Sequence, residues 1–163
     1  MRFVRNKKGF TLVELLAVIA ILAILVIIAL PNVLSMFNQA KEDTFATETK
    51  EMVKIAQQQY LANFGKYTKY AVSNNGNDAA GTALAIVDCA ENTPTASQYC
   101  KINKEAGNLT SFVVEFNKAD GQVAKVLTTD GTYSFHFPYK DDEGNEVKVY
   151  DATKVKDNGT ADK

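Results

Sequence analysis

The sequence predicts an α+β protein, in which one long N-terminal helix packs the C-terminal half of its length on a small antiparallel β-sheet. First, an apolar run extends from Phe10 to Leu30 and carries a single charge, Glu14. Second, the stretch from Asn32 to Phe64 contains no Gly or Pro and is rich in helix formers. Third, strand-like segments in the last third of the chain are separated by Asp-Gly and Glu-Gly pairs, which are hairpin signals.

Composition and charge limit the classes of function. The 163 residues suffice for one domain with an appendage, and 46% apolar content argues against a disordered chain. From Asn32 onward the sequence has fourteen Lys, no Arg and eighteen acidic residues. An acidic body without arginine argues against nucleic acid as a partner, because neutralising phosphates requires a basic face.

The apolar run has the length of a membrane span. As a helix, its 21 residues would extend roughly 31 Å, about the thickness of the hydrocarbon core. Four basic residues precede the run, and the first charge after it is Lys41. This asymmetry predicts a cytoplasmic N-terminus and a head outside the cytoplasm. A secretory signal is disfavoured because small residues have the wrong spacing in Ala20-Ile21-Leu22-Ala23.

Glu14 distinguishes this segment from a plain membrane anchor. A carboxylate at mid-membrane costs about 2.5 kcal/mol or more, and an anchor gains nothing from it. An amine is the natural partner, and cleavage after Gly9 would create one on Phe10, four residues from Glu14. Gly9 suits a cleavage site, since a residue without a side chain lets a protease approach the backbone.

The segment Lys7-Lys8-Gly9-Phe10-Thr11-Leu12-Val13-Glu14-Leu15 resembles the prepilin processing motif of type IV pilins and pseudopilins. The resemblance implies that a prepilin peptidase removes residues 1–9 and N-methylates Phe10. It also implies that Glu14 pairs with the Phe10 amine of a neighbouring subunit in a helical filament. A membrane before assembly, an inner-membrane assembly platform and a separate ATPase are the other implied partners.

The expected function is therefore that of a type IV pilus subunit, assembled into a cell-surface filament for adhesion or twitching motility. One alternative is a pseudopilin of a type II secretion or DNA-uptake system, because Gly65-Lys66-Tyr67 resembles a pattern common in pseudopilins. The other alternative is a membrane-anchored adhesin that does not polymerise.

Pro31 either ends the helix or kinks it, because it lacks an amide hydrogen and clashes with the preceding turn. The helix-forming stretch after it favours the kink. We expect a transmembrane and filament-core helix over 10–31, an amphipathic helix of the head over 32–65, and a globular head over 66–163. The apolar stripe of the second helix is predicted to comprise Leu34, Phe37, Phe45, Met52, Val53, Ile55, Ala56, Tyr60 and Phe64, with Gly65 ending the helix.

The head is expected to begin with a polar loop over 67–78 and short helices over 79–90 and 93–105. Thr93-Pro94 supplies a helix-start signal for the second of these. Four strands are predicted to follow at 109–116, 122–128, 133–137 and 146–150, with frayed residues at 151–163.

Cys89 and Cys100 are the only cysteines. In an exported domain, so close a pair predicts a disulfide bond, which would staple the two short helices and contribute about 3 kcal/mol.

Enzyme chemistry is not expected. The single histidine, His136, alternates with Phe135 and Phe137 and is predicted to be an ordinary strand residue. The motifs for phosphate binding or nucleophilic catalysis are absent from the sequence. No cofactor is expected; the acidic cluster from Asp141 to Glu146 raises calcium as a possibility, but its spacing differs from that of a calcium helix–loop–helix and favours a solvated turn.

Overall fold

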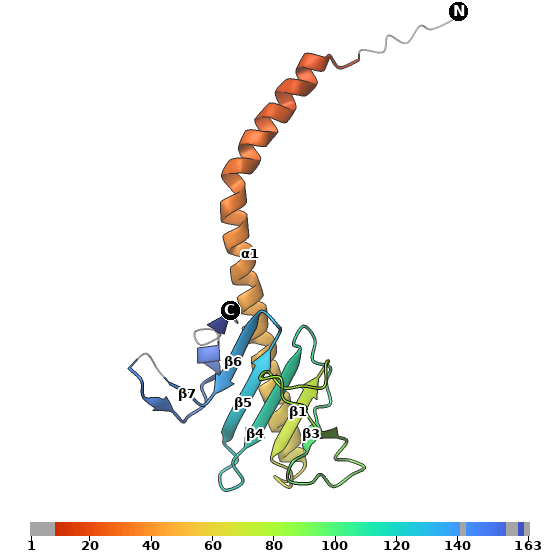
Figure 1. Cartoon of the computed structure of the whole chain (residues 1–163), viewed down its shortest axis with the longest axis vertical. Coiled ribbons are helices and arrows are strands. Elements are labelled where there is room, and N and C mark those ends of the chain that lie inside the picture. The colour runs from red at the N-terminus through yellow and green to blue at the C-terminus, as the bar shows by residue number, and fades with distance from the viewer. Residues whose placement is uncertain (1–8, 141–142, 156–159, 162–163) are drawn as a thin grey trace, which may run out of the picture. The chain divides into compact units, whose positions relative to one another are not determined.

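The computed structural model of the protein describes residues 9–140, 143–155 and 160–161 (Figure 1). The chain forms two compact units, residues 1–40 and residues 41–163. Of the predicted leader peptide, residues 1–8 lie outside the described residues. The two units are considered in turn.

Helix α1 spans Leu12–Ala62, so it begins two residues after and ends three residues before the predicted limits of 10 and 65. It continues through Pro31, so the alternative that Pro31 ends the helix is wrong, while the kink itself stays a prediction. Within the described residues, α1 alone is long and apolar enough to cross a membrane, and its apolar window is not buried in the protein. The length and composition of this helix agree with one spanning segment, and the span itself stays a prediction.

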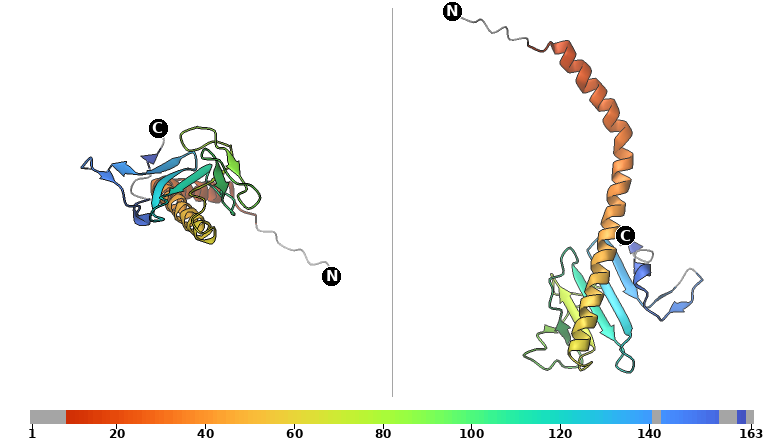
Figure 2. Two further views of the ribbon diagram at one scale, coloured as in Figure 1. Left: turned by 90° about the horizontal axis from the view of Figure 1, so that it is seen from below. Right: turned by 180° about the vertical axis from the view of Figure 1, so that it is seen from behind.

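In the second unit, the C-terminal half of α1 lies across one face of the main sheet (Figure 2). Phe45, Met52 and Ala56 belong to the predicted stripe and are buried there, whereas Leu34 and Phe37 are exposed. The helix residues that the fold buries are Phe45, Ala46, Thr49, Met52, Val53 and Ala56. Opposite them, the sheet contributes the aromatic and β-branched side chains that complete the core, among them Tyr70, Phe112, Val114, Val126, Phe135 and Phe137.

The main sheet has seven strands in the order β2-β3-β1-β4-β5-β6-β9. Strand β3 is parallel to both β1 and β2, and the other pairings are antiparallel. A separate hairpin pairs β7 with β8. The strand limits are Lys69–Ser73 (β1), Ile86–Val87 (β2), Tyr99–Lys101 (β3), Ser111–Phe116 (β4), Val123–Thr129 (β5), Tyr133–Phe137 (β6), Tyr139–Lys140 (β7), Glu146–Val147 (β8) and Thr160–Ala161 (β9).

The predicted meander is confirmed at its centre, where β4, β5 and β6 occupy the segments expected at 109–116, 122–128 and 133–137. The two turns follow the predicted chemistry. Gly121 and Gly131 have positive φ angles of 70° and 88°, and Asp120 and Asp130 accept hydrogen bonds from backbone amides of their own turns. The strand predicted at 146–150 is shortened to β8, which pairs with β7 outside the main sheet.

Both predicted short helices are wrong. Within 79–90, the Asp78 carboxylate accepts hydrogen bonds from the amides of Ala80 and Thr82, and Gly81 has a φ of 81°. These local bonds compete with a helix, and the chain continues into β2. Within 93–105, the chain forms β3, because Cys100 pairs with Tyr70 of β1 and with Val87 of β2.

Two further predictions need correction. The polar loop expected at 67–78 contains β1, whose Tyr70, Ala71 and Val72 are buried in the middle of the sheet. The frayed segment expected at 151–163 includes a 3₁₀ helix at Ala152–Val155, with Val155 fully buried, and the edge strand β9. Burial of Val155 and pairing with β6 hold parts of this segment in place.

Candidate processing and assembly site

The first described residues precede helix α1. Phe10 lies just before the helix with its side chain 92% exposed. Gly9 does not have a left-handed backbone, and a Cβ added to it would meet no heavy atom within 4 Å. The fold itself therefore imposes no requirement for glycine at position 9.

Thr11 and Glu14 form a capping box at the start of α1. The Glu14 amide donates to the Thr11 hydroxyl oxygen at 3.3 Å, and the Thr11 amide donates to Glu14 Oε2 at 2.8 Å. The Thr11 hydroxyl also donates to Oε2, at 2.8 Å. This reciprocal arrangement satisfies two of the backbone donors that a helix N-terminus leaves without an intrahelical partner.

The capping box gives Glu14 a role within a single chain. In an apolar environment, a backbone donor without a partner is costly, so a membrane helix gains from the cap even as a plain anchor. The expectation that an anchor gains nothing from Glu14 is therefore incomplete. Both bonds fall on Oε2, and Oε1 accepts no hydrogen bond from the described part of the chain.

Thr11 is the functional residue that the sequence reasoning missed. Its signal was present, because Thr11-Leu12-Val13-Glu14 has the Thr-x-x-Glu spacing of a capping box directly before an apolar run. The sequence interpretation treated Glu14 only as a charge within the membrane and did not consider its spacing from Thr11.

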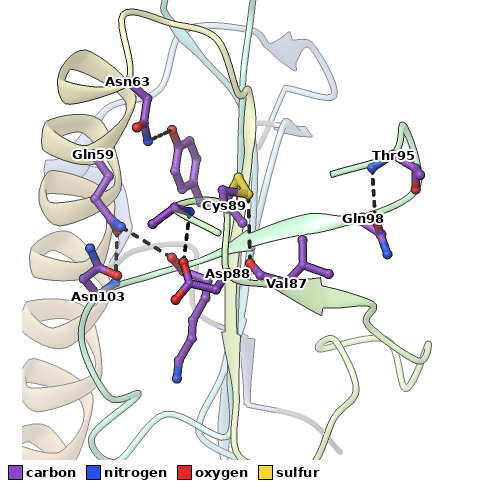
Figure 3. The surroundings of a disulfide bond; sticks show 12 residues. Gln59, Asn63, Val87, Asp88, Cys89, Thr95, Gln98 and Asn103 are labelled. Atoms are coloured by element: carbon purple, nitrogen blue, oxygen red, sulfur yellow. Dashed lines mark hydrogen bonds between the residues drawn. A yellow bond between two sulfur atoms is a disulfide. The ribbon is translucent and has the colours of Figure 1, made fainter. Parts of the chain in front are cut away.

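Cys89 and Cys100 form the predicted disulfide bond. The bond joins the loop after β2 to the middle of β3, so it links a loop and a strand and not two helices (Figure 3). Cys100 is buried in the core, whereas Cys89 packs at its edge.

The chain that follows β3 is attached to α1 at several points. Gln59 donates to the Lys101 carbonyl at 3.4 Å and accepts from the Asn103 amide at 3.1 Å (Figure 3). Further along, Lys104 pairs with Glu51 at 2.6 Å, and Asn108 donates to Glu48 at 2.7 Å. Residues 101–108 therefore run antiparallel to α1, and the disulfide lies where this segment begins.

The remaining candidates carry no site in the described residues. His136 is exposed on β6 between the buried Phe135 and Phe137, as predicted for a strand residue. Asp141 and Asp142 of the acidic cluster lie outside the described residues. Among the residues that the structure describes, no group of three or more His, Cys, Asp or Glu side chains is placed to hold a metal ion.

Comparison with known proteins places these features in a family. Residues 4–30 match the family model of the prokaryotic N-terminal methylation motif. The chain is 32% identical over 121 residues to the type IV wide pilus major component PilA4 of Thermus thermophilus, a match that covers 71% of this chain and 86% of that protein. No solved structure matches the chain significantly. The chain belongs to the type IV pilin family.

Proposed function

We propose that the protein is cut between Gly9 and Phe10, N-methylated on Phe10 and polymerised through its apolar helix into a cell-surface filament. As a type IV pilin, it is a structural subunit of a type IV pilus. The observation that carries the proposal is the position of Glu14, whose carboxylate caps α1 through one oxygen and keeps the other for an ammonium group.

Gly9 supports cleavage at this position. Neither the backbone conformation nor the available space requires a glycine at position 9. The glycine is therefore explained better by an interaction with another protein than by folding. A peptidase that must reach the backbone between residues 9 and 10 provides that interaction. Cleavage also removes Arg2, Arg5, Lys7 and Lys8, which would otherwise hold the segment at the cytoplasmic surface.

Glu14 and the new Phe10 amine balance each other's charge. A carboxylate buried without a partner is costly, whereas a hydrogen-bonded pair with an ammonium is tolerated. In the filament, Oε1 of Glu14 accepts from the Phe10 ammonium of an adjacent copy while Oε2 keeps the cap. The charge pair thereby fixes the axial register of neighbouring helices.

The apolar face of α1 supplies the assembly energy. Large side chains such as Leu15, Ile21 and Ile28 are more than half exposed in the single chain. Lipid covers them before assembly, and neighbouring helices cover them in the filament. The protein acts as a structural element, with adhesion or motility as its role, and relies on a prepilin peptidase, a membrane assembly platform and a separate ATPase.

The test is mass spectrometry of surface material sheared from cells, combined with electron microscopy. We expect long filaments whose subunits begin at a monomethylated Phe10. Processed and methylated subunits without filaments would favour the pseudopilin alternative. Chains that still begin at Met1 would favour the non-polymerising adhesin and contradict the proposal.

A further inference from the structure

Helix α1 ends in a Schellman motif that places a phenylalanine where glycine is the usual residue. The Gly65 amide donates to the Tyr60 carbonyl at 2.9 Å, and the Phe64 amide donates to the Leu61 carbonyl at 3.0 Å. Phe64 therefore holds the C′ position and has a φ of 52°. A left-handed backbone at a residue with a side chain costs roughly 5- to 30-fold in the folding equilibrium.

Burial of the side chain does not offset this cost. Phe64 is 98% exposed, although the sequence predicts it as part of the core stripe, because the left-handed turn lies beyond the end of the helix. Leu61, one helical turn earlier, is 69% exposed. Next to Leu61 lies an open groove of about 410 Å³ between α1 and the turn that joins β4 to β5. We call Leu61, Phe64 and this groove the helix-end patch.

A second apolar surface occurs on α1 just after the predicted membrane span. Val33, Leu34 and Met36 are 56%, 55% and 69% exposed. The continuous apolar run ends at Leu30, and the span from Phe10 already matches the hydrocarbon thickness. On the predicted span, these three side chains lie beyond the hydrocarbon core, and we call them the post-span surface.

We propose that the helix-end patch of one copy packs on the post-span surface of another copy in the filament. The two surfaces differ, so their contact is heterologous, and a heterologous contact propagates into an open helical array. A patch-to-patch contact would close into a dimer and leave the post-span surface in water. One contact between copies buries both surfaces. The burial of the Phe64 ring in the filament then offsets the conformational cost of its left-handed backbone.

This inference rests on the proposed polymerisation, and Phe64→Gly separates it from a role in folding. Glycine suits the left-handed position, so the substituted full-length chain in detergent is expected to shift its unfolding equilibrium roughly 5- to 30-fold toward the folded state. Because the ring is lost, the yield of sheared filaments is expected to fall at least tenfold. A destabilised chain, or an unchanged filament yield, would overturn the inference.

A matched control is Val149→Ser, which removes another exposed apolar side chain of the head, 76% exposed, and is expected to leave filament yield unchanged. An equal loss of filaments in this control would show that assembly depends on exposed apolar residues in general and not on Phe64 in particular, which would contradict the inference. The unsubstituted chain serves as the reference. Its failure to form filaments would overturn the proposed function itself.

Photo-crosslinking identifies the contact directly. Benzoylphenylalanine at position 64 of filament-forming chains is expected to give adducts between copies that map to residues 32–41. Adducts confined to residues 66–163 of a neighbour, or adducts within one copy only, would contradict the proposed contact while leaving cleavage at Gly9 and filament formation standing.

Discussion

The carboxylate of Glu14 accepts hydrogen bonds from both the backbone amide and the hydroxyl of Thr11, each at 2.8 Å. A single side chain thus completes the helix cap and carries the charge that the proposed function needs. Because a capping box can use glutamine in place of glutamate, the two roles can be separated experimentally.

Glu14→Gln retains the cap and removes the charge. We expect normal insertion and processing of the prepilin, followed by a loss of filaments of at least tenfold, because the Phe10 ammonium would have no carboxylate to pair with. The measurement is filament yield from sheared cells together with mass spectrometry of the remaining membrane-bound subunit. Filaments at normal yield would show that the cap alone is required.

Thr11→Ala is the complementary change, since it removes the two capping bonds of the hydroxyl and leaves the charge. The loss of a threonine cap costs about 0.5–2 kcal/mol of helix stability. We expect faster hydrogen exchange at the first turn of α1 and a smaller loss of filaments than in Glu14→Gln. Thr11→Ser, which preserves the hydroxyl, serves as the control and should behave like the unsubstituted chain.

Removal of the disulfide should weaken the head without abolishing its fold. A closed loop of this size contributes about 3 kcal/mol by the loop-entropy estimate, and the double substitution Cys89→Ala with Cys100→Ala removes it. Chemical unfolding of the full-length chain in detergent gives the free energy of unfolding. Since Gln59 and Lys104 still attach residues 101–108 to α1, exchange should accelerate mainly between residues 88 and 99. Uniform acceleration across the head would contradict this local effect.

Tyr150 predicts a loss of stability in alkali. Burial, and secondarily the negative charge of Asp151, raises the pKa of Tyr150 from 10.0 to about 12. In the folded chain, the Tyr150 hydroxyl therefore stays protonated at pH values where the same hydroxyl in the unfolded chain is ionised. This contribution to stability is complete below about pH 10 and is lost as the pH rises through about 12.

Tyr150→Phe tests this prediction. The hydroxyl of Tyr150 is buried without a hydrogen-bond partner in the described residues, so its removal at neutral pH should be neutral or stabilising. Between pH 10 and 12, the variant should lose less free energy of unfolding than the parent chain. An identical pH dependence in both chains would assign the effect to other groups, such as Tyr99, whose pKa is also raised to about 12, mainly by burial.

Sequence reasoning recovered the elements whose signals are long or locally complete. Helix α1 shows its pattern over 51 residues, and the pairs at Asp120 and Asp130 mark hairpins between alternating strands. The short strands β2 and β3 were missed because they have only two and three residues and form by pairing with partners far away in the sequence. Thr93-Pro94 is a helix-start signal that tertiary pairing of Cys100 with Tyr70 overrides.

The proposed processing site depends on a different kind of sequence signal. The roles proposed for Gly9, Phe10 and Glu14 rest on chemistry that residue type and spacing specify, and none depends on distant packing. Phe64 shows the limit of such reasoning: its place in the apolar periodicity predicts burial, but the left-handed turn at the helix end exposes it. Periodicity does not reveal this turn, because the helix ends at Ala62 and the glycine follows the left-handed residue Phe64 instead of occupying its position.

A filament reconstruction that resolves the first residues of α1 tests the central claim most directly. The account predicts that the Phe10 nitrogen of one copy lies about 2.7–2.9 Å from Glu14 Oε1 of its neighbour, the range of a charge-assisted hydrogen bond, with Thr11 still bonded to Oε2. A Glu14 carboxylate that faces water, or a Phe10 nitrogen placed beyond the reach of any Glu14, would contradict it.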